Sequence, residues 1–417
     1  MVSCYGNIQL LKDRGLSMTT YNFDKITNRK GTNCLKYDFA VERGKPADVL
    51  PLWVADMDFP VSEEITKSLH AAVEHGIYGY TQPKDAYYNA VMNWMERNHN
   101  WKTEREWIVK TPGVVFALGA AVKAFTDPGD TILIQNPVYY PFTNIIRDND
   151  RRVVDNTLIY EKTAGQSGDN GYRIDFEDFE RKLEQEHIKL FILCNPHNPV
   201  GRVWTAEELQ QLGEICLRHH VIVVSDEIHN DFVYPGYEHT VFATVDPRFA
   251  EFTVTCTAPS KTFNLAGLQI SNIFIPNEKL RKAFQTEIDK TGYDEPNALG
   301  IVACEAAYRA GEDWLDQLRA YLLKNLNFLR NFLQEKIPQI HLVEPEGTYL
   351  VWLDCSELGI TGKELDQFIV DKAGLWLDGG SMFGPSGAAF QRVNIACPQA
   401  TLELALNKLK AAVDNLE

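Results

Sequence analysis

The sequence lacks a long hydrophobic run, paired cysteines and an excess of basic residues. No apolar stretch approaches the roughly 18 residues of a membrane-spanning helix. The eight cysteines lie scattered from Cys4 to Cys397 without a CxxC pair or a Cys/His cluster, so we expect reduced thiols in a cytoplasmic protein and no metal site. The formal net charge is −16, which argues against nucleic acid and anionic membranes as partners. Small anionic ligands are not excluded, because a local site can be positive on an acidic protein.

The N-terminus also lacks the long apolar centre of a signal peptide. We expect residues 1–17 to form a disordered extension before the folded protein. The chain of 417 residues is too long for one small core, and 45% of its residues are hydrophobic, as in ordinary globular proteins. We therefore expect two domains: a large one over residues 61–300, and a small one that combines residues 18–60 with 301–417.

Short apolar runs alternate with amphipathic segments in the middle of the chain. The runs are apolar throughout, which is typical of parallel strands covered on both faces. Between them, Thr205 and Glu208 make a T-x-x-E capping box at the start of a helix that we expect over residues 205–220. The alternation predicts an α/β fold with a large, doubly wound domain and a mostly parallel sheet. We expect its buried strands at 131–137, 188–196, 221–228, 252–260 and 270–276.

The pattern changes after about residue 300, where long helical and alternating segments replace the short apolar runs. We read this part as a smaller α+β domain that ends in a helix with one apolar stripe. The stripe consists of Leu402, Leu406, Leu409, Val413 and Leu416. The other elements expected in this part are helices over 312–336 and 362–374 and strands at 348–354 and 391–397.

Polar residues follow three of the expected parallel strands. CNPHNPVG follows the strand at 188–196, SDEIHND follows the next, and APSKTFN follows the third. In an open α/β sheet, ligands bind beyond the carboxyl ends of the strands. Three polar segments on neighbouring strand ends therefore indicate a binding site.

Two residues in these segments carry distinctive chemistry. Lys261 is the one charged residue in TCTAPSKTFNLAG (255–267), and burial would lower its pKa and make it a nucleophile or a base; the alternative is a lysine that faces water. Asp226 follows an apolar strand, where a carboxylate needs a cationic partner; a helix cap or an arginine ion pair is its alternative. A lysine that forms a Schiff base and an aspartate that holds a protonated pyridine nitrogen are what pyridoxal 5′-phosphate (PLP) needs from a protein.

Further residues fit such a site, although each has an ordinary alternative. Asn198 could donate to the phenolate oxygen of the cofactor, or simply form a turn. Tyr139 could stack on the ring, or belong to the core. Arg392 could clamp a carboxylate, or lie on the surface. The helix that starts at GVVFAL could bind phosphate with its free N–H groups, although many helices begin in this way.

In their order and spacing, the motifs TPGVVFAL, NPVYYPF, NPHNPVGR, SDEIHNDF, APSKTFNLAGLQ and FQRVNIACP resemble those of the fold-type I PLP enzymes, the aspartate aminotransferase superfamily. The resemblance covers nearly everything from about residue 20 to 417. It implies that Lys261 forms the Schiff base and that Asp226 holds the pyridine nitrogen. It also implies a homodimer with shared active sites. The further roles that it implies are an O3′ donor for Asn198, ring stacking for Tyr139 (or Tyr140), a substrate-carboxylate clamp for Arg392, phosphate contacts for the backbone of Val114 and Val115 and the hydroxyl of Ser260, and a contact of Tyr80 with the phosphate of the partner subunit.

Three positions depart from the common pattern of that superfamily. Gln269 stands where many aminotransferases have a phosphate-binding arginine, and Ala258 stands where they have a serine. His229, which the resemblance places at the cofactor, replaces the usual tyrosine. These departures, together with PLWVADMDFP (51–60), SDEIH and AFQRVNIACP, resemble the cystathionine β-lyase branch of aminotransferase-like C–S lyases, which includes the maltose-regulon modulator protein. Ala389 replaces a glycine that often precedes the phenylalanine of the last motif.

The resemblance implies a β-elimination, in which an L-amino acid such as cystathionine loses its Cα proton to Lys261 and its β-thiolate leaves. The products are pyruvate, ammonia and a thiol. An aminotransferase begins with the same proton removal, so the site residues do not separate the two activities; the branch motifs favour the lyase. A regulatory role through protein–protein contacts is a further alternative, although Lys261 and Asp226 are both present for catalysis.

Overall fold

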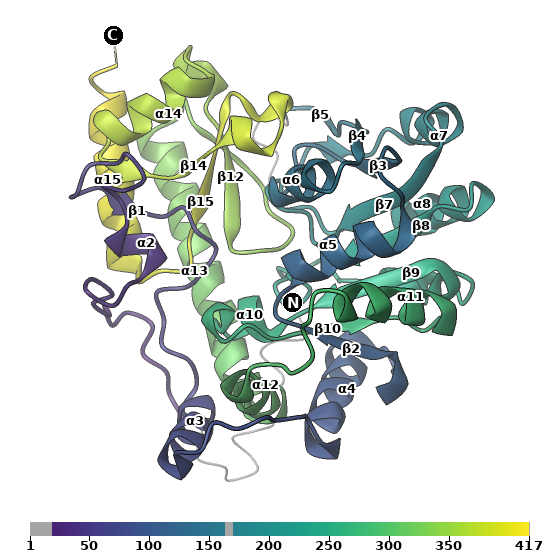
Figure 1. Ribbon diagram of the computed structural model, residues 1–417. Coiled ribbons are helices and arrows are strands. Elements are labelled where there is room, and N and C mark those ends of the chain that lie inside the picture. Colours follow the sequence, from purple (N-terminus) through teal and green to yellow (C-terminus); the bar gives the residue numbers. More distant parts are fainter. Residues whose placement is uncertain (1–18, 163–169, 417) are drawn as a thin grey trace.

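A seven-stranded sheet forms the centre of the protein in the computed structural model, which describes residues 19–162 and 170–416 (Figure 1). The strand order is β2-β10-β9-β8-β7-β3-β4. The five strands from β9 to β4 are parallel, whereas β10 runs antiparallel to both of its neighbours. The strands are β2 (Ile108–Thr111), β3 (Thr131–Ile134), β4 (Arg152–Asp155), β7 (Ile188–Cys194), β8 (Ile222–Asp226), β9 (Thr253–Thr257) and β10 (Ser271–Phe274).

Helices cover both faces of this sheet, which explains why its strands are apolar throughout. On β7, Ile192 packs into one hydrophobic cluster, while Phe191 and Leu193 pack into another on the opposite face. The first cluster includes residues of α5 (Val114–Phe125), α6 (Pro141–Asp148) and α11 (Glu278–Asp289). The second includes residues of α7 (Phe176–Gln185), α8 (Ala206–Arg218) and α9 (Phe242–Val245).

The expected strands and the helix between them are present at the predicted places. The capping box is also present, because the Thr205 hydroxyl accepts from the Glu208 N–H and the Glu208 carboxylate accepts from the Thr205 N–H. The short edge strands β2 and β4 were not predicted. The predicted aspartate aminotransferase-like fold requires a mostly parallel sheet, and the structure has one.

A smaller, antiparallel sheet of order β11-β12-β15-β14 lies in the C-terminal part of the chain. The N-terminal segment joins this part, because β1 (Leu50–Pro51) pairs in parallel with β13 (Leu375–Trp376). The division into two domains remains a prediction. The strands here are β11 (His341–Val343), β12 (Leu350–Asp354), β14 (Asp378–Gly379) and β15 (Phe390–Asn394), and the helices are α2 (Leu35–Asp38), α13 (Glu312–Lys336), α14 (Gly362–Asp371) and α15 (Gln399–Val413).

The apolar stripe of the last helix is buried at four of its five predicted positions, and Leu416 lies just beyond the end of α15. The remaining α-helices and strands of the described residues are α3 (Glu63–His75), α4 (Asp85–His99), α10 (Pro259–Thr262), α12 (Ala298–Ala310), β5 (Ile159–Tyr160) and β6 (Tyr172–Arg173). Within the described ranges, no helix is long and apolar enough to cross a membrane. The predicted extension, residues 1–17, lies outside the described residues.

Candidate active site

The site forms at the carboxyl ends of β3, β7, β8 and β9, where four chain segments leave the sheet side by side (Figure 1). These segments carry most of the residues that the sequence singled out. The C-terminal sheet lies across this edge and contributes β15 (Figure 1). Residues that are far apart in the chain therefore meet in one place.

Asp226 is the last residue of β8, and it pairs with residues of β7 and β9 on either side. The residue is 4% exposed, and its Oδ1 atom accepts a hydrogen bond from the Ile228 N–H at 3.2 Å. Its carboxylate has no ion-pair partner within the described part of the chain. Burial raises the pKa of Asp226 to about 7, against the opposing effects of the Ile228 N–H and the positive charge of Lys261. This carboxylate lacks a cation of its own.

Lys261 lies in α10, the short helix that follows β9, the strand next to β8. Its Nζ atom donates a hydrogen bond to the Ala55 carbonyl at 2.9 Å. Burial and the nearby charge of Arg392 lower the pKa of Lys261 to about 8, while Asp56 and Asp226 oppose the shift. A large fraction of the amine is therefore neutral near pH 8, as a nucleophile or base requires.

Arg392, in the middle of β15, is 2% exposed and is held by three groups. Its Nη1 atom donates to Asn198 Oδ1 at 3.0 Å, and its Nη2 atom donates to the Trp53 carbonyl at 3.0 Å. The Asp378 carboxylate forms an ion pair with the same Nη2 atom. The Nε atom is buried and has no partner. The guanidinium is therefore fixed in place with donor capacity left over.

Asn198 lies in the turn after β7, between the cis peptide Asn195–Pro196 and its own cis peptide to Pro199, and it is 4% exposed. Its side-chain Oδ1 atom is used by Arg392. The amide Nδ2 atom is consequently the group with which Asn198 can donate to a ligand. The turn that the sequence suggested for this segment is present, and the contact of Asn198 with a cofactor stays a prediction.

Two tyrosines follow β3 at this edge. The rings of Tyr139 and Tyr140 lie 5.5 Å apart at their centroids. Burial raises the pKa of Tyr139, and the neighbouring Tyr140 adds to the effect; the charges of Arg392 and Asp226 also act on this hydroxyl. Tyr140 packs edge-on against Phe383 at 6.1 Å. The negative charge of Asp226 therefore acts on the hydroxyl of Tyr139. The stacking of Tyr139 on a cofactor ring stays a prediction.

His229 lies three positions after Asp226 and is 3% exposed. Its ring meets that of Tyr349 at 5.9 Å, and its Nδ1 atom is buried without a hydrogen-bond partner. Burial, together with the positive charges of Lys261 and Arg392, holds the pKa of His229 well below its usual value. The imidazole is therefore neutral at pH 7.

The start of α5 offers backbone N–H groups at the same edge. Gly113 is the N-cap of this helix, Val114 is buried and Val115 is 44% exposed. A Cβ atom built on Gly113 would meet nothing within 4 Å, so the space beside the helix start is open. The Ser260 hydroxyl makes no hydrogen bond to any described residue. These groups fit an anion, because free N–H groups at a helix start bind phosphate well.

Comparison with known proteins identifies the family. The aminotransferase class I and II model matches residues 47–409. The chain belongs to this family. It is 46% identical to cystathionine beta-lyase PatB of Bacillus subtilis over 94% of this chain and all of that protein. The similarity predicted from the motifs is confirmed.

Two solved structures confirm the fold. One is the PLP-bound putative aminotransferase of Clostridium difficile, with a TM-score of 0.90 and 41% identity over 94% of this chain and all of that chain. The other is cystalysin of Treponema denticola, which contains a PLP cofactor, with a TM-score of 0.91 and 37% identity over 96% of this chain and all of that chain. The family therefore includes structures of this architecture with the cofactor in place.

The sequence analysis missed two groups at this site, the carboxylate of Asp378 and the carbonyl of Ala55. Asp378 pairs with Arg392, and the Ala55 carbonyl accepts from both Lys261 and the hydroxyl of Tyr349, the latter at 3.0 Å. A carbonyl carries no signal in the sequence, and Asp378 has only its place in the short segment LDGG, which forms β14. Neither could be assigned without the long-range contacts.

Tyr80 is the one predicted site residue that the single chain does not bring to the others. It lies in the loop between α3 and α4 with 96% of its surface exposed. Ile77 and Tyr78 of the same loop are also exposed, at 72% and 61%. A contact of Tyr80 with the phosphate of a partner subunit stays a prediction.

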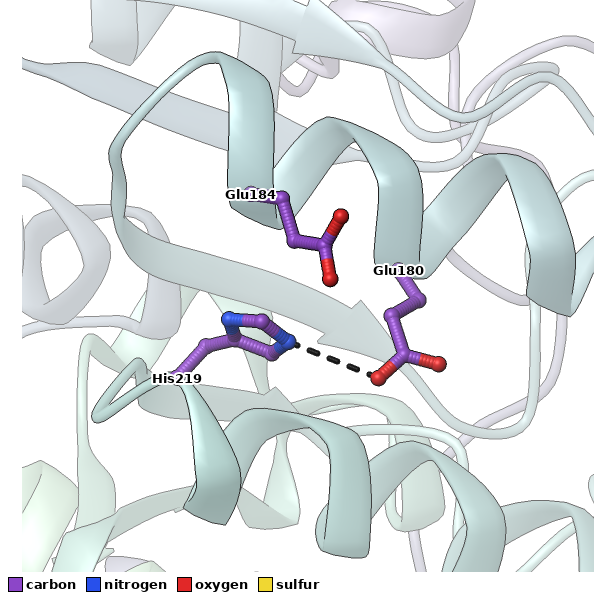
Figure 2. Close-up of side chains that lie close together, drawn as sticks. All are labelled: Glu180, Glu184 and His219. Carbon is purple, nitrogen blue, oxygen red and sulfur yellow. Dashed lines mark hydrogen bonds and ion pairs between the residues drawn. The ribbon is translucent and has the colours of Figure 1, made fainter.

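A group of three possible metal ligands lies elsewhere, on α7 and just after α8 (Figure 2). Glu180, Glu184 and His219 point toward one another, and Glu180 is already bound by Arg218 at 2.5 Å. His219 lies three positions before β8 begins, so the group lies at the amino ends of the strands, at the edge opposite to the site. Glu180 therefore already has a cationic partner from the protein itself.

Proposed function

We propose that this protein is a PLP-dependent C–S β-lyase that cleaves L-cystathionine or a related cysteine S-conjugate to pyruvate, ammonia and a thiol. The observation that carries the proposal is the pair of Asp226 and Lys261 on adjacent strand ends, a buried carboxylate without a cation beside an amine of lowered pKa. The similarity to a cystathionine β-lyase at 46% identity supports the lyase activity. The similarity to cystalysin supports the cofactor.

The residues present fit PLP. The protonated pyridine nitrogen of PLP is the cation that the buried carboxylate of Asp226 lacks, and burial would strengthen such a pair. The free N–H groups of Val114 and Val115 and the hydroxyl of Ser260 suit a phosphate. Because Gln269 and Ala258 supply neither the arginine nor the serine common in the superfamily, the backbone carries more of this anchoring.

PLP, when bound, supplies an electron sink that stabilises negative charge at the Cα atom of an amino acid. Lys261 would hold PLP covalently, and its Nζ atom, when free, would accept the Cα proton of an amino-acid substrate. Its lowered pKa favours the neutral form that can accept this proton. The Ala55 carbonyl then receives a hydrogen bond from the protonated amine.

Arg392 binds the α-carboxylate of the substrate, for which its planar guanidinium is suited. Asn198, Trp53 and Asp378 hold that guanidinium so that the Cα–H bond is aligned with Lys261. The neutral imidazole of His229 adds no positive charge beside Lys261. The electron pair left at Cα would form a double bond to Cβ as the bond from Cβ to sulfur breaks, and the thiolate would leave with the electrons of that bond. Hydrolysis of the aminoacrylate would then give pyruvate and ammonia.

We further propose that the protein acts as a homodimer in which Tyr80 reaches the phosphate of the partner subunit. Its side chain makes no hydrogen bond or ring contact with any other described residue, and two more apolar side chains of the same loop face outward. Such a row of exposed apolar residues is typical of a protein–protein interface.

A transaminase is the second candidate, because one similar structure bears the name of an aminotransferase. The test is to incubate the purified protein with L-cystathionine and no keto acid, and to measure pyruvate and free thiol. We expect both products from the wild type, and neither from Lys261→Ala, which should also lose the visible absorption of bound PLP. Products that form only when 2-oxoglutarate is added would show that the protein is a transaminase.

A further inference from the structure

Two buried carboxylates outside the proposed mechanism lie close to it in the chain. Glu227 and Asp231 follow Asp226 by one and five positions, and they are 0% and 3% exposed. A buried carboxylate is costly unless hydrogen bonds and positive groups compensate it. Both are fully hydrogen-bonded, so the question is what these bonds hold in place.

Asp231 is held by side chains from three helices, α4, α10 and α13. Its Oδ1 atom accepts from the Trp94 Nε1–H at 3.2 Å and contacts the His99 Nε2 atom at 3.1 Å. Its Oδ2 atom accepts from the Thr262 hydroxyl at 2.6 Å, and Arg319 lies 3.8 Å from Oδ1. Burial alone would raise the pKa of Asp231, but His99, Arg319 and Thr262 together hold it below its usual value. The group is therefore ionised at neutral pH.

The Thr262 contact leads directly to the active lysine. Thr262 is the residue after Lys261 and the last residue of α10, and it is 0% exposed. The next residue, Phe263, packs edge-on against Trp94 with ring centroids 5.4 Å apart. Two contacts therefore fix the turn that carries Lys261: the short hydrogen bond from Thr262 to the charged carboxylate of Asp231, and the packing of Phe263 against Trp94.

Glu227 directly follows Asp226 in the chain, just as Thr262, the partner of Asp231, directly follows Lys261. Its carboxylate accepts from the Ser225 hydroxyl at 2.8 Å and from the Phe242 N–H at 3.1 Å, and it contacts His239 Nε2 at 3.0 Å. The ring of His239 meets that of His99 at 5.6 Å and 90°. The two imidazoles therefore join the two carboxylates into one buried network.

We propose that Asp231 is a positioning residue for Lys261, and that it acts through the Thr262 hydroxyl. The network fixes the turn of α10 relative to the end of β8, and so it sets the place of the amine relative to Asp226. Since catalytic groups must be held within a fraction of an ångström, such support governs the rate more than the binding of substrate. The inference rests on the proposed function.

The test uses the PLP-loaded, full-length protein and the variants Thr262→Val and Thr262→Ser. Valine keeps the shape of threonine without the hydroxyl, and serine keeps the hydroxyl. We expect Thr262→Val to lower kcat by about 10- to 100-fold with little change in KM, and to change the visible circular dichroism of bound PLP, which reports its orientation. Thr262→Ser should restore both. Thr286→Val, which removes a helix-surface hydroxyl, is the control.

A second pair of variants decides the matter if Thr262→Val does not fold. His99→Phe removes a contact to Asp231 far from Lys261, whereas His99→Gln keeps a donor in place of Nε2. The network is supported if His99→Phe lowers kcat and changes the circular dichroism of bound PLP, and His99→Gln does neither. Folded variants with wild-type kcat and spectrum overturn it. A wild type that neither binds PLP nor forms pyruvate would instead overturn the proposed function.

Discussion

Arg392 donates a hydrogen bond from Nη1 to the Oδ1 atom of Asn198, and 194 positions separate the two residues in the chain. The bond joins β15 of the C-terminal sheet to the turn after β7 of the central sheet. It fixes the amide of Asn198 so that Nδ2 is the free donor. A substrate that binds Arg392 and a cofactor that binds Asn198 would therefore influence each other through one shared contact.

Replacement of Arg392 by lysine tests the carboxylate clamp. Lysine keeps the charge but loses the planar, two-pronged geometry and the bonds to Asn198 and Trp53. We expect kcat/KM for L-cystathionine to fall about 10- to 100-fold, which corresponds to the roughly 1.5–3 kcal/mol of a hydrogen bond to a charged group. Steady-state kinetics check this, with the exposed Arg181→Lys as control. An unchanged KM would contradict the clamp.

Asp226→Asn should change how the stability of the cofactor-free protein depends on pH. Burial raises the pKa of Asp226 from 3.8 to about 7, so the folded protein binds this proton more tightly than the unfolded chain does. The contribution of Asp226 to the free energy of unfolding therefore falls as the pH rises from about 4 to about 7. Urea unfolding at about pH 5 and about pH 7.5 measures this. Between the lower and the higher pH, the free energy of unfolding of the wild type should fall relative to that of the asparagine variant.

The other titrating groups are common to the two proteins, so only this difference is diagnostic. A stability difference that stays constant between the two pH values would mean that Asp226 is not perturbed by burial. The same variant should lose β-elimination activity when PLP is added, because the neutral amide cannot keep the pyridine nitrogen protonated.

Mixed dimers test the role of Tyr80. Tyr80→Ala and Lys261→Ala should each lose most of the β-elimination activity as pure proteins. If Tyr80 serves the partner subunit, a hybrid dimer has one site with both defects and one site with neither. Mixing the variants under conditions of subunit exchange should therefore restore up to about a quarter of the wild-type activity, since about half of the random dimers are hybrids. If subunit exchange is confirmed by mass spectrometry and no activity returns, Tyr80 serves the site of its own subunit and the proposal is wrong.

The cap of α8 offers a test of stability alone. Thr205→Ala removes the hydroxyl that accepts from the Glu208 N–H, and we expect a loss of about 1 kcal/mol in the free energy of unfolding. Thr205→Ser should retain most of it. Denaturant unfolding of the three proteins measures this, and kcat should not change because the hydroxyl of Thr205 bonds only within the first turn of α8. An alanine variant as stable as the wild type would show that the box contributes nothing.

The sequence alone determined the local structure and predicted the residues of the site. Apolar runs located the buried strands, because a strand covered on both faces has no polar side, and Thr205 with Glu208 marked a helix start through bonds within four residues. Lys261, Asp226 and Arg392 were recognisable because only certain side chains can form an imine, balance a pyridinium or clamp a carboxylate. The motif order then indicated the family, which the comparisons confirmed.

Only the tertiary structure decided what those side chains touch. The pairing of Arg392 with Asp378, the shared acceptor at Ala55, and the link from Asp231 through Thr262 to Lys261 join segments that lie far apart or carry no local pattern. The antiparallel direction of β10 was equally invisible, since a buried strand has the same composition in either direction. These contacts and the strand direction depend on how the whole chain packs. The free energy of folding that favours them comes from the entire core and not from any short segment.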